Sequence, residues 1–360
     1  MFPASNPVNG TGSTHMSMQQ QSYERMLEGL RRDFGPCLEE FKNPRLQELM
    51  LNPDGRLWRE VAGEGMSDTG IRFTKTEAEQ LFTDLAGILG LELTARQPII
   101  ECELPIGGHR FAGLIAPIVQ GGPAFAIRVQ NSLGITLQDF AARGVLTDKS
   151  DPANRHRIAR ADFIEMVEGK SHLEIIELGI RLRKNMLIIG GTGSGKTTLL
   201  NAIADSTSKI NPDHRIVIIE DTREVICASA NVVQMRTNRD AQVDMTKCLM
   251  TTLRLRPDRI FVGEVRDGAA LALLKMWGTG HPGGLATVHA DDCYGGLVRL
   301  ERMIEENPGI RANPHSIADA IDLCIFIEKD KEAEAGRKVR EVAVVERYDN
   351  STNRYVLRQV

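Results

Sequence analysis

The sequence predicts an α/β fold, with a mainly parallel sheet in a larger C-terminal domain and a smaller α+β domain before it. The first observation is a glycine-rich loop, GGTGSGKTT at 190–198, between the apolar run MLII at 186–189 and a helix-like run. The second is the alternation of helix-like and strand-like segments after residue 161. The third is that polar residues directly follow three strand-like segments. Together these features are typical of βαβ units around a parallel sheet.

Length and composition set the broad class of the protein. With 360 residues, of which 42% are hydrophobic, the chain can form two or three domains with sizeable cores. Lys and Arg total 44 and Asp and Glu total 48, which gives a net charge of −4 and argues against a protein that coats nucleic acid through bulk charge. We find no apolar run of about 20 residues and no signal peptide, so we expect a cytoplasmic protein.

The cysteines do not indicate a metal site or a disulfide framework. The chain has six, and they are widely scattered without a C-x-x-C pair: Cys37, Cys102, Cys227, Cys248, Cys293 and Cys324. We therefore expect single buried thiols in a reducing compartment.

The N-terminal part divides into a leader, 1–21, and an α+β domain, 22–143. The leader is polar and aperiodic, so we expect disorder, and residues 10–16 resemble an expression-vector scar. Apolar residues then recur at helical spacing from 22 to about 51, and the amphipathic part at 23–41 fits a helix packed on its own domain better than a membrane or partner helix. The remaining predicted elements are a helix at 77–89 and strands at 57–61, 99–104, 110–118 and 124–129.

A polar, proline-containing segment at 144–160 predicts a linker, and the second domain spans 161–360. Its predicted helices are 161–183 and 196–206, and its predicted strands include 186–190, 215–219, 259–262, 339–347 and 354–357. The charged run at 329–338 contains a glycine and reads as an exposed turn.

The loop at 190–198 fits the phosphate-binding pattern G-x-x-x-x-G-K-[ST]. It predicts a nucleoside triphosphate, ATP, with Mg²⁺ as the ligand. Glycines let backbone N–H groups approach phosphate oxygens, and the following helix adds its positive end. A glycine-rich turn that binds nothing is the alternative, but it does not need Lys-Thr-Thr at the helix start. The predicted nucleotide-binding residues are Gly190, Gly191, Thr192, Gly193, Ser194, Gly195, Lys196, Thr197 and Thr198.

Within this loop two side chains have predicted roles. Lys196 should reach the β- and γ-phosphates, and the hydroxyl of Thr197 should bind Mg²⁺.

Acidic or imidazole groups follow three strand-like segments after the loop. Glu220 follows IVII, Glu264 follows IFVG, and His289 follows LATV. A carboxylate at a strand end can hold the water shell of magnesium or polarise an attacking water, and a histidine there can contact the γ-phosphate. An acidic helix cap explains any one of them equally well. Their repetition on successive strands favours a hydrolytic site.

These segments resemble those of a known family. The phosphate loop, the acidic segment IEDTRE at 219–224, the RPD…GEVR segment at 256–266 and GLATVHA at 284–290 are similar to those of secretion and pilus ATPases. Within that group the chain most resembles the conjugal-transfer TrbB-type ATPases of type IV secretion systems. The resemblance extends from about residue 22 to the C-terminus and is most specific from 185 to 300.

The resemblance implies a hexameric ring of two-domain subunits, each with a RecA-like C-terminal ATPase domain, and nucleotide bound between the domains. It assigns a metal or water contact to Glu220, the Walker B role of orienting water to Glu264, and a γ-phosphate sensor to His289. It also implies arginines of the first domain that close over the nucleotide, and Arg128 matches this pattern better than Arg110. A solvated surface charge is the alternative for each arginine.

The same resemblance implies partners among the inner-membrane components of a secretion or conjugation machine. Peripheral association with the cytoplasmic face of the inner membrane fits that role, and we expect no stable nucleic-acid binding.

Three other functions are weighed: a type IV pilus or type II secretion ATPase, a nucleotide-dependent scaffold with little turnover, and a helicase. The absence of a four-cysteine zinc module disfavours the extension ATPases of the first group but leaves retraction motors open, and Glu264 disfavours the scaffold. The balanced charge disfavours the helicase.

Overall fold

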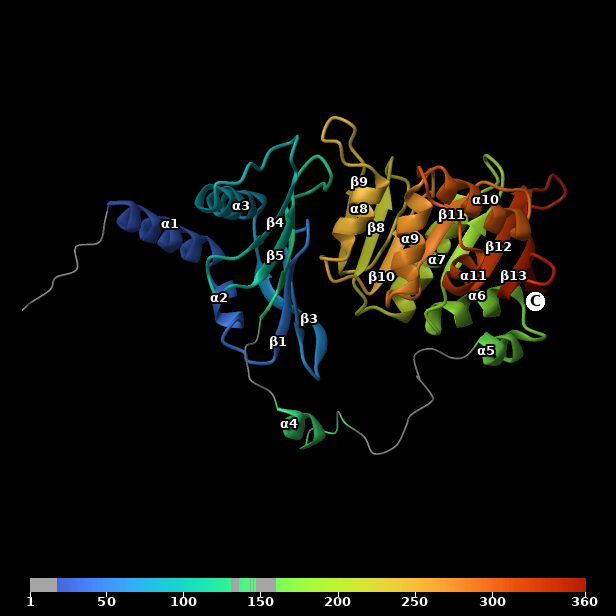
Figure 1. Cartoon of the computed structure of the whole chain (residues 1–360), viewed down its shortest axis with the longest axis horizontal. Helices are drawn as coiled ribbons and strands as arrows, with labels where there is room; N and C mark the ends of the chain where they lie inside the picture. The colour runs from blue at the N-terminus through green and yellow to red at the C-terminus, as the bar shows by residue number, and fades with distance from the viewer. Residues whose placement is uncertain (1–17, 131–135, 143, 145, 147–159) are drawn as a thin grey trace, which may run out of the picture.

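The computed structural model describes residues 18–130, 136–142, 144, 146 and 160–360. It contains two sheets, which Figure 1 shows side by side, with the N-terminal sheet at the left and the C-terminal sheet at the right. Residues 1–17 of the predicted leader, which include the possible vector scar, and all of the predicted linker except residues 144, 146 and 160 lie outside the described residues. Residues 18–21, for which the sequence predicts disorder, are instead helical.

The first sheet has six strands in the order β3-β2-β1-β6-β5-β4, and every neighbouring pair is antiparallel. The strands are β1 (Leu46–Leu51), β2 (Arg56–Val61), β3 (Gly65–Arg72), β4 (Ile99–Glu103), β5 (Arg110–Leu114) and β6 (Ala124–Arg128). The helices of this part are α1 (Met18–Phe34), α2 (Cys37–Glu40), α3 (Lys75–Leu89) and α4 (Leu137–Ala142). A capping box between Thr74 and Glu77 begins α3, which packs against α1.

The expectation of helical structure up to about residue 51 is wrong. The helix α1 ends at Phe34, before Gly35 (φ +49°) and Pro36, and residues 46–51 form the central strand β1 between β2 and β6. Five of the six residues of β1 are buried, because both faces of this strand are covered. A strand buried on both faces lacks the alternation of apolar and polar residues that identifies a half-buried strand. The apolar residues of such a strand can therefore also fit helical spacing.

The second sheet has eight strands in the order β14-β13-β12-β7-β11-β10-β8-β9. Its strands are β7 (Met186–Ile189), β8 (Ile216–Glu220), β9 (Val232–Arg236), β10 (Arg259–Val262), β11 (Leu285–Val288), β12 (Leu323–Lys329), β13 (Arg337–Asp349) and β14 (Arg354–Gln359). The strands from β12 to β9 pair in parallel, whereas β13 and β14 are antiparallel additions at one edge. All residues of β7, β8, β10 and β11 are buried, as expected for a parallel sheet with helices on both faces.

Two apolar cores cover the two faces of this sheet. One contains residues of α5 (Arg160–Val167), α6 (His172–Arg181) and α7 (Lys196–Ile210). The other contains residues of α8 (Met245–Thr252), α9 (Ala269–Gly278), α10 (Cys293–Glu305) and α11 (Pro314–Ala320). The single helix predicted over 161–183 is therefore two helices, separated at Gly169 (φ +72°) and restarted by the capping box of Ser171 and Glu174.

The two sheets meet through a shared core and a short set of polar contacts. Met50 and Trp58 of the first sheet belong to the same apolar cluster as Val233 and Met235 of the second. The backbone N–H of Arg236 donates to the carbonyl of Ile118 at 2.8 Å. Among the described residues, no helix has the length and hydropathy needed to cross a bilayer.

Candidate active site

The glycine-rich loop follows β7 and leads into α7, which begins at Lys196. Gly193 (φ +70°) and Gly195 (φ +101°) have a backbone conformation that residues other than glycine rarely adopt. At Gly190 an added Cβ would lie 2.6 Å from the Ser194 Oγ and would also collide with the carbonyl of Ile327. The glycines are therefore required by the shape of the loop.

Lys196 extends back over this loop. Its Nζ donates to the carbonyls of Gly190 and Gly191, each at 2.9 Å, and lies 3.3 Å from the Nδ1 of His289. Burial lowers the pKa of Lys196, and the nearby charge of Glu264 opposes this effect. The ammonium group thus has loop carbonyls as partners, which a phosphate can replace.

Ser194 supplies a direct test of whether an anion fits the loop. Its side chain is buried, and its Oγ has no hydrogen-bond partner among the residues that the structure describes. Such an orphaned hydroxyl is costly unless a ligand satisfies it. Because it lies in the loop before the positive end of α7, the arrangement fits a phosphate group.

Glu264 and His289 meet beside Lys196, each just after a parallel strand. The Nε2 of His289 lies 3.3 Å from the Oε1 of Glu264, and the Nη2 of Arg266 donates to Oε2 at 2.6 Å. The hydrogen bond from Arg266 holds the pKa of Glu264 below its usual value, although burial opposes it. Burial, with the charge of Lys196, lowers the pKa of His289. At neutral pH the site therefore contains an ionised carboxylate beside a neutral imidazole.

Glu220 lies at the end of β8 and is almost completely buried. Its Oε1 accepts from the backbone N–H groups of Glu224 (2.9 Å) and Val225 (2.7 Å), and its Oε2 accepts from Gln234 at 2.5 Å. These bonds organise the loop that follows β8. The role of Glu220 as a metal or water contact stays a prediction.

The same loop brings Glu224 to the phosphate loop. The hydroxyl of Thr197 donates to the Oε2 of Glu224 at 3.2 Å. The Nδ2 of Asn201 also donates to the carbonyl of Glu224 at 3.1 Å. Sequence reasoning missed Glu224, although it belongs to the acidic segment 219–224, because its position four residues beyond the strand does not reveal its direction.

Arg128 and Arg110 lie on the first sheet, opposite each other on β6 and β5. The Nε of Arg128 lies 3.8 Å from the Oε1 of Glu48, and the Arg128 side chain is 73% exposed. No contact among the described residues joins either arginine to the phosphate loop of the same chain. Their role at the nucleotide stays a prediction.

Comparison with known proteins identifies the family. The family described as "Type II/IV secretion system protein" matches residues 155–351, more than half of the chain. The chain belongs to this family.

Two curated relatives and one solved structure extend this result. The conjugal transfer protein TrbB of Rhizobium radiobacter is 42% identical over 92% of this chain and 94% of its own length. The type IV secretion system protein VirB11 of Bartonella henselae is 31% identical, covering 80% of this chain and 86% of its own. The crystal structure of the VirB11 ATPase from the Brucella suis type IV secretion system matches with a TM-score of 0.81 at 22% identity. It covers 90% of this chain and 96% of the other, which confirms the predicted fold.

Membership of the secretion family confirms the resemblance drawn from the loop, the acidic segment and the two later strand ends.

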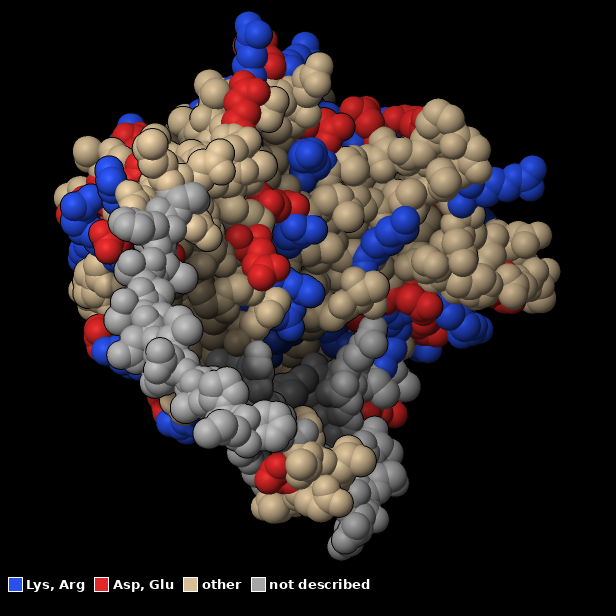
Figure 2. Space-filling view, turned by 60° about the vertical axis from the view of Figure 1, so that its left-hand side comes forward, with Lys and Arg blue, Asp and Glu red and all other residues tan. Residues whose placement is uncertain are grey.

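The surface charge agrees with the balanced numbers of acidic and basic residues in the sequence. On the face shown in Figure 2, basic side chains and acidic side chains are interspersed.

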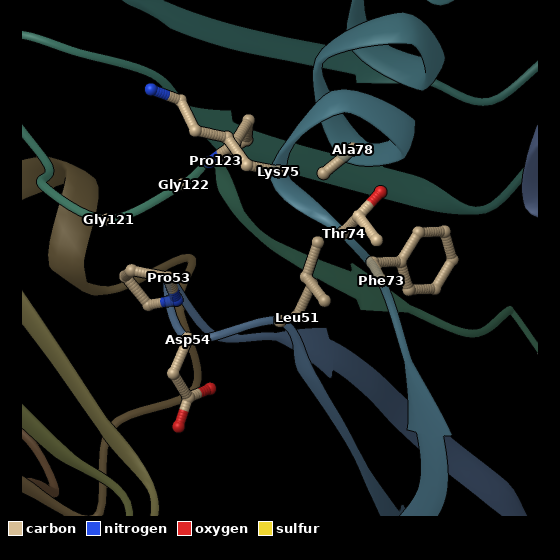
Figure 3. A pocket seen from close by; sticks show the side chains of 11 residues that line it. Leu51, Pro53, Asp54, Phe73, Thr74, Lys75, Ala78, Gly121, Gly122 and Pro123 are labelled. Atoms are coloured by element: carbon tan, nitrogen blue, oxygen red, sulfur yellow. The ribbon is translucent and has the colours of Figure 1, made fainter.

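A hollow of about 280 Å³ lies in the N-terminal part of the chain (Figure 3). It is enclosed by the turn between β1 and β2, the start of α3 and the loop before β6. Its lining contains none of the predicted site residues: Leu51, Pro53, Asp54, Gly55, Phe73, Thr74, Lys75, Ala78, Gly121, Gly122 and Pro123.

Proposed function

We propose that this chain is an ATP-hydrolysing motor that powers conjugative transfer through a type IV secretion system. The observation that carries the proposal is the carboxylate of Glu264, which Arg266 holds beside His289 and Lys196 at the strand ends next to the phosphate loop. The relatives named as conjugal transfer and type IV secretion proteins support the biological role.

The phosphate loop would bind the nucleotide through its backbone N–H groups and two of its side chains. The N–H groups at the start of α7 and the hydroxyl of Ser194 would bind phosphate oxygens, which satisfies the orphaned Oγ. Lys196 would exchange the carbonyls of Gly190 and Gly191 for the β- and γ-phosphates.

The residues around Thr197 fit a magnesium ion. The Thr197 hydroxyl and the Glu224 carboxylate, 3.2 Å apart, are hard oxygen groups of the kind that Mg²⁺ prefers, with Glu220 close behind in the same loop. When bound, Mg²⁺ neutralises phosphate charge during transfer.

Glu264 is placed to orient the attacking water. Arg266 fixes one carboxylate oxygen, so the other oxygen faces His289 and the phosphate loop. An ionised carboxylate in this position can accept a hydrogen bond from water and align it with the γ-phosphate. His289 contacts both Glu264 and Lys196, so it can report the presence of the γ-phosphate to the water-orienting group.

A ring of six subunits would complete the site. Arg128 is mostly exposed, and Arg110 lies opposite it on the same sheet, so both can face a neighbouring copy. A guanidinium from a neighbouring subunit stabilises charge on the transferred phosphoryl group. We also propose that the ring acts at the cytoplasmic face of the inner membrane, with membrane components of the transfer machine as partners. A mass measurement with Mg-ATP at micromolar concentration should give a hexamer, whereas a monomer alone would contradict the ring.

Plasmid transfer from a deletion strain tests this role against the alternative of a scaffold with little turnover. Complementation with Lys196→Ala or with Glu264→Gln should abolish transfer, because the first loses phosphate contacts and the second loses water orientation. Restored transfer by Glu264→Gln, with transfer still lost in Lys196→Ala, would instead support the scaffold. Wild-type transfer with both variants would contradict the motor.

A further inference from the structure

The hairpin that joins β12 to β13 lies against the phosphate loop. Arg337, at the start of β13, donates from Nη1 to the Oγ1 of Thr198 at 3.2 Å. The same nitrogen is 2.5 Å from the point where a Cβ on Gly195 would lie. The Nζ of Lys329, at the end of β12, is 3.1 Å from the corresponding point on Gly193. Two basic side chains therefore occupy space beside the loop that only glycines leave open.

These two cations differ from a neighbouring arginine in their partners. In the part of the chain that the structure describes, neither Lys329 nor Arg337 has a carboxylate within ion-pair distance, and the other side-chain bond of Arg337 is to the carbonyl of Ala335 at 3.4 Å. By contrast, Arg340 on the same strand pairs with Glu328 at 2.6 Å and with Asp330 at 3.1 Å. The charge of Arg340 is neutralised locally, and that of Arg337 is not.

The position of Arg337 suits contact with an anion on the phosphate loop. It lies at the N-terminal end of α7, where the helix presents its positive pole and four unpaired N–H groups. Lys196 adds another positive charge in the same turn. A bound phosphate would reverse the sign of this interaction, because the guanidinium then faces negative oxygen atoms.

We propose that Arg337, aided by Lys329, binds the phosphates of the nucleotide that are not transferred. This inference rests on the proposed function, since it requires a nucleotide in the phosphate loop. Thr198 lies one residue further into α7 than Thr197, the predicted metal ligand beside the β- and γ-phosphates. Arg337 reaches the loop from the Thr198 side, so it contacts phosphates that ADP and ATP share. It is a binding residue, which affects affinity for both nucleotides and leaves the chemical step unchanged.

Equilibrium binding of Mg-ADP and of a slowly hydrolysed ATP analogue to the full chain tests this assignment. Arg337→Gln should raise the Kd of both nucleotides by about tenfold, as expected for the loss of a charged hydrogen bond. The kcat at saturating ATP should stay close to the wild-type value. Because Gln can still bond the Thr198 hydroxyl, a purely structural tie between Arg337 and the loop predicts an unchanged Kd. Arg337→Lys should restore part of the affinity, and Lys329→Gln should have a smaller effect than Arg337→Gln.

Arg340→Gln is the matched control, because it removes an arginine from the same strand whose partners are Glu328 and Asp330. Its Kd should equal that of the wild type. An unchanged Kd in Arg337→Gln, an equal loss in both variants, or a loss for the ATP analogue alone would overturn the assignment. If the wild type binds nucleotide and Lys196→Ala binds it weakly, such a result overturns only this inference. If the wild type binds no nucleotide, the proposed function fails as well.

Discussion

Charged side chains lie at both ends of the parallel strands β8 and β10, but their burial and their hydrogen-bond partners differ between the two ends. At the N-terminal ends, Arg215 and Arg259 are only 0% and 1% exposed. Arg215 donates to the carbonyl of Leu255 and to the amide oxygens of Asn52 and Asn231 at 2.7, 2.5 and 2.6 Å. Arg259 donates to the carbonyls of Ile180 and Gly283 and to two further side chains, those of His214 and Asn211.

At the C-terminal ends the polar groups are left with capacity to bind. Within the described part of the chain, Lys196 has only carbonyls of its own loop and the imidazole of His289 as hydrogen-bond partners, and Ser194 Oγ has none. Glu264 keeps a carboxylate that is 26% exposed. A buried network with most of its bonds made stabilises the fold, whereas groups that lack partners are available to a ligand. The two ends differ in access rather than in charge: Arg215 and Arg259 are buried among protein partners, although the Nη2 of Arg215 is unbonded among the described residues, whereas Glu264 and His289 remain partly exposed.

The largest effect should come from the functional end. Lys196→Ala should lower ATP turnover by roughly 10²–10³-fold or more, because a cation that faces the transferred phosphate is lost. Its free energy of unfolding should change by less than about 1 kcal/mol, as for a residue bonded to carbonyls of its own loop and to the imidazole of His289. Steady-state hydrolysis and urea unfolding of the same preparation check both parts. Normal turnover combined with a large loss of stability would show that Lys196 has a structural role and would contradict the functional assignment of this end of the sheet.

The structural end should give the opposite result. Arg215→Met should lower the free energy of unfolding by about 3–5 kcal/mol, because it leaves the amide oxygen of Asn52 and the carbonyl of Leu255 without their donor. The kcat of the folded variant at low temperature should remain close to that of the wild type. Urea unfolding monitored by circular dichroism measures the first quantity.

Lys209→Met provides the control for Arg215→Met. It removes an exposed basic side chain paired with Asp205 at 2.6 Å, so its cost should be below about 1 kcal/mol. Equal stability of Arg215→Met and Lys209→Met would contradict the structural role of the buried network.

A smaller effect should appear in the pH dependence of stability, and its source is Glu48, which lies near the contact between the two sheets. Burial raises the pKa of Glu48 from 4.5 to about 7, against the opposing charges of Arg128, Arg256 and Arg215 and with the support of Glu60. The folded state therefore binds the Glu48 proton more tightly than the unfolded state does. Its contribution is fully present below about pH 4.5 and is lost as the pH rises toward 7.

Glu48→Gln isolates this contribution because the amide does not titrate. Relative to the variant, the wild type should lose about 2 kcal/mol of unfolding free energy between pH 5 and pH 8. This figure is smaller than the full pKa difference implies, because solvent screens part of the interaction. Parallel unfolding curves at several pH values measure the difference. A wild type that gains stability over this interval relative to Glu48→Gln would show that the carboxyl is ionised and paired.

The functional end was largely predictable from sequence, because its parts are local. The phosphate loop and the residues after the strands, Glu220, Glu264 and His289, lie within short segments with recognisable spacing, and parallel strands bring their ends to one edge. The loop glycines are also set by backbone geometry.

What the sequence did not reveal depends on contacts between distant segments. Glu224 reaches Thr197 only because Glu220 folds the intervening loop, and Arg337 reaches Thr198 only because β12 pairs beside β7. The buried bonds of Arg215 likewise join residues 163 positions apart. No local pattern records such distances, so these residues read as ordinary surface charges.

The central claim is that the C-terminal strand ends form a hydrolytic site in which Glu264 orients water. The most direct measurement is ATP hydrolysis by Glu264→Gln, with ATP binding measured in parallel, and with Glu79→Gln on the exposed face of α3 as the matched control. The account predicts wild-type ATP affinity in both variants and a loss of turnover of at least about 100-fold in Glu264→Gln alone. Wild-type turnover in purified Glu264→Gln would contradict it.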